Sequence, residues 1–168
     1  IGNVSRLALG EDDGTSTKVS WSTGDAFALK IGEQTYTFNW KSGNDFEYAN
    51  GNGDFPETFA TASTITATYP ATSTVNLLRQ SGTKANVGNY MQMTAGLAVT
   101  AGQSTTDLNL NFEHQTSVVE ITLENDQYAN RKAVVELRTQ AEAMYSTPTE
   151  DAQQVQFDGS GKLTVYFA

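Results

Sequence analysis

Hydrophobic and polar residues alternate with period two along much of this chain. Gln34–Trp40 shows the pattern most simply, with Tyr36, Phe38 and Trp40 on one side and threonine or asparagine on the other. Such alternation is typical of a β-strand with one buried face, because successive side chains of a strand point to opposite sides. We therefore expect these three aromatic side chains to lie in a hydrophobic core.

The same period returns in many short segments. The strongest signal covers Asp107–Glu124, where two long strands are expected to meet near His114. Turn residues at Thr23–Asp25 and at Asp158–Gly161 predict hairpins between the strands that flank them. Only Gln140–Met144 has a helical pattern. Further strands are predicted at Thr17–Trp21, Ala26–Ile31, Thr64–Tyr69, Val75–Arg79, Ala133–Leu137, Val155–Phe157 and Leu163–Phe167.

These strands predict an all-β fold, a two-sheet β-sandwich that is mainly antiparallel. The sequence supplies no helices for the crossover connections that a parallel sheet needs. Its 168 residues suit one domain that can bury a core without disulfides. Because we find no internal repeat or linker, we expect a single β-sandwich domain over residues 1–168.

Composition narrows the classes of partner. Lys and Arg number 10 against 19 Asp and Glu, giving a formal net charge of −9, which opposes binding to nucleic acid or to an anionic membrane surface. Cysteine is absent, which excludes disulfides, a thiol nucleophile and Cys-ligated zinc within this sequence. Charged residues make up 17% of the chain, below the roughly 25% of an average soluble domain. Uncharged polar residues replace them, which favours an exported β-protein.

Few residues offer catalytic chemistry. His114 is the single histidine, and most metal sites and acyl-transfer triads use imidazole as a ligand or a base. Since nucleophile-elbow, Walker A and dinucleotide-binding motifs are also missing, we expect a non-enzymatic protein without a cofactor or a metal. Calcium binding by Glu11–Asp13 or by the Asn50–Asp54 loop stays open, although neither segment has the ligand spacing of an EF-hand.

Aromatic residues also allow a different interpretation, a carbohydrate-binding module. Phe46 and Tyr48 lie in a region rich in turn residues, so they are the candidate glycan contacts in this alternative. Tyr36, Phe38 and Trp40 share one strand face and are better explained as core residues. A hydrolase with two carboxylates far apart in the chain is a third alternative.

Several motifs resemble those of fimbrillin-like proteins, the subunits of type V pili and related surface lipoproteins. Arg6–Thr15 followed by Lys18–Asp25, with its Trp-x-x-Gly-Asp turn, is similar to the start of that family. Three later segments agree with the family in order and spacing and extend the resemblance over most of the chain. They are Ala67–Pro70, similar to a Tyr-Pro strand end, Leu110–His114, similar to a Phe-x-His segment, and Val118–Leu123, similar to the strand that follows.

The resemblance implies a transthyretin-like sandwich that forms the N-terminal domain of a longer precursor. It further implies a lipoprotein of the outer membrane, held at the cell surface by an upstream lipid anchor, and assembly by donation of a strand between subunits. In this family a first strand precedes an arginine at which proteolytic processing occurs, and Arg6 stands where that arginine would be. We therefore expect the N-terminal end to lie beside an unpaired sheet edge or a shallow apolar groove.

The function expected from the sequence is that of a structural or adhesive subunit of cell-surface fimbriae (pili). Its partners would be other pilus subunits, through donor-strand pairing, together with host or bacterial surface ligands. The alternative, a carbohydrate-binding module of a surface or secreted protein, should keep a complete sandwich and expose coplanar aromatic rings. A pilus subunit should instead have an open groove and buried aromatic residues.

Overall fold

Antiparallel strands dominate the computed structural model, which describes residues 8–12, 17–49, 51, 53–72, 75–106, 108–138, 143–149 and 154–168. Each strand pairing among these residues is antiparallel. The predicted all-β, mainly antiparallel, sandwich-like fold is therefore confirmed. None of the described helices is long and apolar enough to cross a membrane.

The chain divides into two compact units, and each unit combines segments that are distant in the sequence. Unit 1 includes Trp21–Thr74 and Gln92–Thr116, whereas unit 2 includes Leu7–Ser20, Val75–Met91 and Ser117–Ala168. The segments of the two units therefore alternate along the chain. That the whole chain forms one domain stays a prediction.

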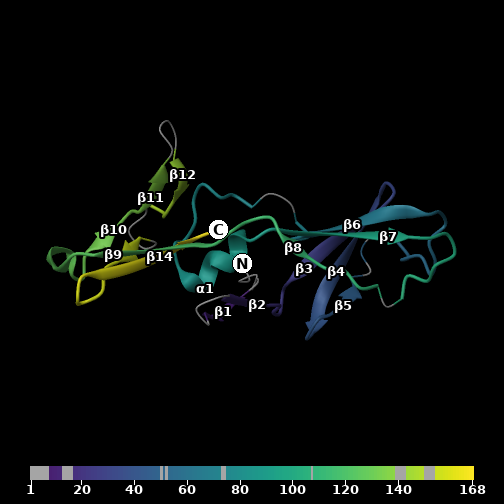
Figure 1. The fold of residues 1–168 in the computed structure, drawn as a ribbon, viewed down its shortest axis with the longest axis horizontal. Helices are drawn as coiled ribbons and strands as arrows, with labels where there is room; N and C mark the ends of the chain where they lie inside the picture. Colours follow the sequence, from purple (N-terminus) through teal and green to yellow (C-terminus); the bar gives the residue numbers. More distant parts are fainter. Residues whose placement is uncertain are drawn as a thin grey trace. The chain divides into compact units, whose positions relative to one another are not determined.

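Unit 1 contains a six-stranded sheet in the order β5-β4-β3-β6-β7-β8, in which Figure 1 shows β6 and β7 running side by side. A two-residue loop joins β3 to β4, and Gly32 at its first position has a φ of 59°, which glycine adopts without steric cost. The strands are β3 (Ala26–Ile31), β4 (Gln34–Ser42), β5 (Asp45–Tyr48), β6 (Ser63–Tyr69), β7 (Met93–Val99) and β8 (Glu113–His114).

One face of this sheet is apolar, and the strand register explains why. Phe27 of β3 lies opposite Phe38 of β4, and Leu29 lies opposite Tyr36, so these side chains point to the same side. Tyr36 is buried, which confirms it as a core residue. Phe38 and Trp40 are only half-buried, so they contribute to this face from less protected positions.

The first of the two long strands predicted within Asp107–Glu124 does not form a paired strand over its full length. Only Glu113–His114 pairs, as β8, with β7. Leu108–Phe112 has no strand partner among the residues that the structure describes. Its side chains nevertheless alternate between half-buried and exposed, so the predicted period is present although the pairing is not.

The hairpin predicted between Thr17–Trp21 and Ala26–Ile31 is wrong. β3 pairs with β4 and β6 in unit 1, whereas β2 (Thr17–Ser20) pairs with β1 (Ala8–Asp12) in unit 2. The turn residues at Thr23–Asp25 therefore connect strands of different sheets. Local turn chemistry is the same in both cases, which is why the sequence pattern did not distinguish them.

Unit 2 contains, in its described part, the two-stranded sheets β1-β2, β10-β13, β11-β12 and β14-β9. β14 supplies the centre of its core, since Leu163, Val165 and Phe167 have only 4%, 0% and 0% of their surface exposed. Val155 and Phe157 pack against them. The remaining strands are β9 (Val119–Glu124), β10 (Lys132–Ala133), β11 (Glu136–Arg138), β12 (Ala143–Ser146), β13 (Val155–Gln156) and β14 (Lys162–Phe167).

The turn predicted at Asp158–Gly161 forms, but the strands on either side of it do not make the predicted hairpin. The backbone N–H of Asp158 donates to the Lys162 carbonyl oxygen at 2.9 Å, which closes the turn. β13 then pairs with β10, and β14 pairs with β9. This turn, like the one at Thr23–Asp25, passes the chain from one sheet to another.

Helical residues lie elsewhere than predicted. α1 (Lys84–Val87), η1 (Gly88–Tyr90) and η2 (Asp126–Tyr128) are short helical turns. The described part of the predicted helix Gln140–Met144 belongs to strand β12. Val75–Arg79, predicted as a strand, contains a turn instead.

Candidate functional site

Side chains that could bind a metal ion do not cluster in the part of the chain that the structure describes. The described ranges contain no group of three or more His, Cys, Asp or Glu residues that could hold a metal ion. His114 is exposed on β8, at the edge of the six-stranded sheet and opposite Met93. A structural role for His114 stays a prediction.

Both segments considered for calcium are only partly described. Glu11 and Asp12 belong to β1, but Asp13 lies outside the described residues. Asn50 and Asn52 also lie outside them. Calcium binding at these segments therefore stays open.

Arg6, the predicted site of proteolytic processing, lies outside the described residues as well. Ile1–Ser5 also lie outside the described residues, so the structure does not describe the sheet edge predicted beside the N-terminal end. Processing at Arg6 and a groove at that end stay predictions.

Phe46 and Tyr48, the candidate glycan contacts, are both half-buried on β5. The Phe46 ring meets Trp21 edge to face, with centroids 5.0 Å apart. The Tyr48 ring lies 5.6 Å from Phe55, and its hydroxyl donates to the Gly53 carbonyl oxygen. Each of the two rings therefore packs against another aromatic ring, whereas stacking on a sugar requires a free ring face. Glycan contact by Phe46 and Tyr48 stays a prediction without added support.

The Trp-x-x-Gly-Asp turn forms a buried polar anchor in unit 1. The Asp25 side chain is almost fully buried. It accepts hydrogen bonds from the Ser22 backbone N–H at 2.7 Å and from the Tyr69 hydroxyl at 2.8 Å. Gly24 has a φ of 96°, a left-handed conformation that glycine adopts readily. The motif thus ties the start of β3 to the end of β6.

Trp21, the first residue of that motif, packs against residues of two other motifs. Its ring centroid lies 5.2 Å from Tyr69 and 5.6 Å from Phe112, both in edge-to-face geometry, which is a favourable aromatic arrangement. Residues from three segments that carry the family resemblance therefore meet in one cluster. In this structure the three rings pack around Trp21.

The outer edge of β9 in unit 2 is the strongest candidate for an interaction site. β9 pairs with β14 along six consecutive residues without a register shift. On its other side it has no strand partner within the described part of the chain. Its row of backbone N–H and C=O groups is thus available to another strand.

Apolar side chains of β9 are exposed along this edge. Leu123 and Val119 lie opposite the buried Leu163 and Phe167 of β14. Leu123 is 39% exposed and Val119 is 44% exposed, whereas Ile121 between them is half-buried against the core. The apolar side of the core therefore continues onto β9 but is only partly covered there. An unpaired edge beside a partly covered apolar surface has the two features that a binding strand requires.

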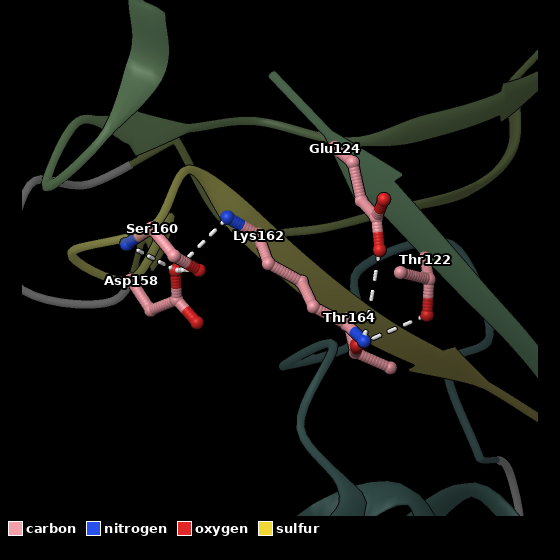
Figure 2. A network of polar contacts seen from close by, with 6 residues as sticks. All are labelled: Thr122, Glu124, Asp158, Ser160, Lys162 and Thr164. Carbon is pink, nitrogen blue, oxygen red and sulfur yellow. Dashed lines mark hydrogen bonds and ion pairs between the residues drawn. The ribbon is translucent and has the colours of Figure 1, made fainter. Parts of the chain in front are cut away.

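The opposite side of the same strand pair is polar, as Figure 2 shows. The hydroxyl oxygens of Thr122 and Thr164 lie 3.1 Å apart, within hydrogen-bond distance. The Lys162 ammonium lies 3.7 Å from the Glu124 carboxylate. β9 therefore has a clear apolar side and a clear polar side.

The Asp158 carboxylate organises the turn that leads into β14. It accepts hydrogen bonds from the Lys162 backbone N–H and from the Ser160 N–H and hydroxyl, with the Ser160 and Lys162 contacts drawn in Figure 2. These donors, the Lys162 N–H foremost, hold the pKa of Asp158 below its usual range because they stabilise the ionised form.

This lowered pKa predicts a pH dependence of stability. Asp158 is more acidic in the folded than in the unfolded chain, so its contribution is present above the unfolded pKa and is lost as pH falls through the folded value. The wild type should therefore melt at a higher temperature than Asp158→Asn near neutral pH, and the difference should shrink as pH falls below the usual Asp range. Melting curves of both proteins across this range test it. A difference that stays constant with pH would contradict it.

Comparison with known proteins adds no relative. No protein-family model, no curated protein and no solved structure matches this chain. The resemblance to fimbrillin-like proteins thus rests on the sequence motifs alone. The edge of β9 is accordingly the main structural indication of function.

Proposed function

We propose that this chain is a structural or adhesive subunit of cell-surface fimbriae that assembles by strand donation between subunits. The observation that carries the proposal is the outer edge of β9, which has no strand partner among the described residues and runs beside the exposed side chains of Val119 and Leu123. A long, flat and apolar edge tends to pair with another chain unless it is protected.

Several of the usual protections of a sheet edge are absent from β9, although Glu120 and Glu124 place charges on it. The strand contains no proline, no lysine and no bulge, all of which discourage pairing at natural sheet edges. A donated strand would hydrogen-bond to the backbone of β9 and cover its apolar side chains. Affinity would then come from main-chain hydrogen bonds and alternating side-chain contacts, consistent with a non-enzymatic protein.

Surface location and a lipid anchor form part of the same proposal. Both follow from the sequence resemblance to fimbrillin-like proteins, in which the subunits are outer-membrane lipoproteins that face the cell exterior. The −9 formal charge suits a protein that does not associate with nucleic acid or with an anionic membrane surface.

Site-specific photo-crosslinking in the cells that produce the protein tests the proposal. A benzoylphenylalanine residue in place of Val119 should crosslink each chain to the subunit that donates its strand, because the donated strand would lie against this side chain. Successive crosslinks along a fibre should then give a ladder of higher-mass products. Leu78 is also exposed and apolar but lies outside β9, so the same residue in place of Leu78 is the matched control and should give no ladder. Equal products at both positions, or no surface fibres that contain the chain, would refute strand donation at β9.

A further inference from the structure

The polar side of β9 is acidic along the same unpaired edge. Glu120 and Glu124 lie on that side with Thr122 between them, and all three are exposed. Glu124 faces Lys162 across the strand pair at 3.7 Å, whereas Glu120 lies opposite Tyr166. The Lys162–Glu124 pair is solvent-exposed and therefore weak. The edge thus presents two carboxylates to an incoming strand.

Resting on the proposed strand donation, we infer that the strand accepted by β9 carries apolar residues on one side and Lys or Arg on the other, at positions facing Glu120 and Glu124. Opposite charges directly across neighbouring strands stabilise the pairing, and like charges destabilise it. The apolar positions of the donor would lie beside Val119, Ile121 and Leu123, because side chains of paired strands share a face in register.

The same glutamates disfavour pairing of β9 with a second copy of itself. Two antiparallel registers give the greatest overlap between β9 of one copy and β9 of the other while placing their apolar sides on the same face. The register centred on Thr122 places Glu120 opposite Glu124 of the other copy, which is repulsive. The register centred on Ile121 places Glu120 opposite Thr122 and gives neither glutamate a basic neighbour. With a net charge of −9 on each copy, a basic donor is the better partner.

Binding of two designed peptides to the purified protein tests this charge selection. Both peptides match β9 in length and carry valine at alternate positions, one with lysine and the other with glutamate at the positions between. By calorimetry, the lysine peptide should bind about tenfold more tightly than the glutamate peptide. The preference should weaken as salt is added, because the charges lie on an exposed edge.

Protein variants separate the local effect from the total charge. Glu120→Lys should abolish or reverse the preference for the lysine peptide. Glu33→Lys makes the same change in net charge in the β3–β4 loop, where Glu33 is exposed, and should leave the preference intact. Leu123→Lys places a charge on the apolar side of the edge and should weaken binding of both peptides.

The outcomes distinguish the two proposals. Equal affinity for both peptides, or a preference that Glu33→Lys weakens as much as Glu120→Lys, would overturn charge selection and leave strand acceptance by β9 standing. Failure of both peptides to bind, or binding that Leu123→Lys does not affect, would overturn the β9 edge as an acceptor and with it the proposed assembly mechanism.

Discussion

Replacing Gly161 with alanine is expected to lower the free energy of unfolding by about 3 kcal/mol. Gly161 has a φ of 79°, which residues with a side chain rarely adopt. A Cβ atom at this position would meet the Asn125 carbonyl oxygen and lie 2.5 Å from Asp126 Cα. Because both are backbone atoms, no side-chain rotation can relieve the clash. Urea denaturation of the wild type and the variant measures the loss.

Gly159, in the same turn, provides the matched control. An alanine Cβ there would have as its nearest neighbour the Asn130 side-chain oxygen at 4.0 Å, an ordinary contact. Gly159→Ala should therefore change stability by no more than about 0.5 kcal/mol. Similar losses in both variants would show that glycine flexibility in general, and not the close approach at Gly161, determines the stability of this turn.

The sequence predicted strand faces better than strand partners. Alternation around Tyr36 identified an apolar face because side-chain direction depends only on local backbone geometry. Pairing depends on segments far apart in the chain, and both predicted hairpins were wrong for this reason. Thr23–Asp25 and Asp158–Gly161 have the turn chemistry of hairpins, but each links strands that belong to different sheets.

The same limit applies to the candidate site. Leu123 and Leu163 lie in strands with equally clear alternation, and they are direct neighbours across β9 and β14. Leu163 is buried because Val155 and Phe157 pack over its strand, whereas Leu123 is 39% exposed. Period-two alternation cannot separate an edge strand from a covered one. Glu120 and Glu124, charges close to an unpaired edge, were the available signal that β9 is an edge strand.

Removal of the Asp25 carboxylate should have an effect of similar size in unit 1. Asp25→Ala is expected to cost about 3 kcal/mol, because it deletes the acceptor of hydrogen bonds from the Ser22 N–H and the Tyr69 hydroxyl. The carboxylate is only 1% exposed, so water cannot readily replace it. The anchor also holds the turn beside Trp21, whose ring packs on Tyr69 at 5.2 Å. The loss should therefore appear in urea denaturation and as a change in tryptophan fluorescence.

Tyr69→Phe isolates one of these two hydrogen bonds. It keeps the ring that packs against Trp21 and removes only the hydroxyl that donates to Asp25 at 2.8 Å. Its expected cost is about 1.5 kcal/mol, the lower end for a hydrogen bond to a charged group. Because the two side chains are in contact, the double variant should lose less stability than the sum of the single variants. Strictly additive losses would mean that the Asp25–Tyr69 bond does not join the start of β3 to the end of β6 energetically, and that the cluster depends on ring packing alone.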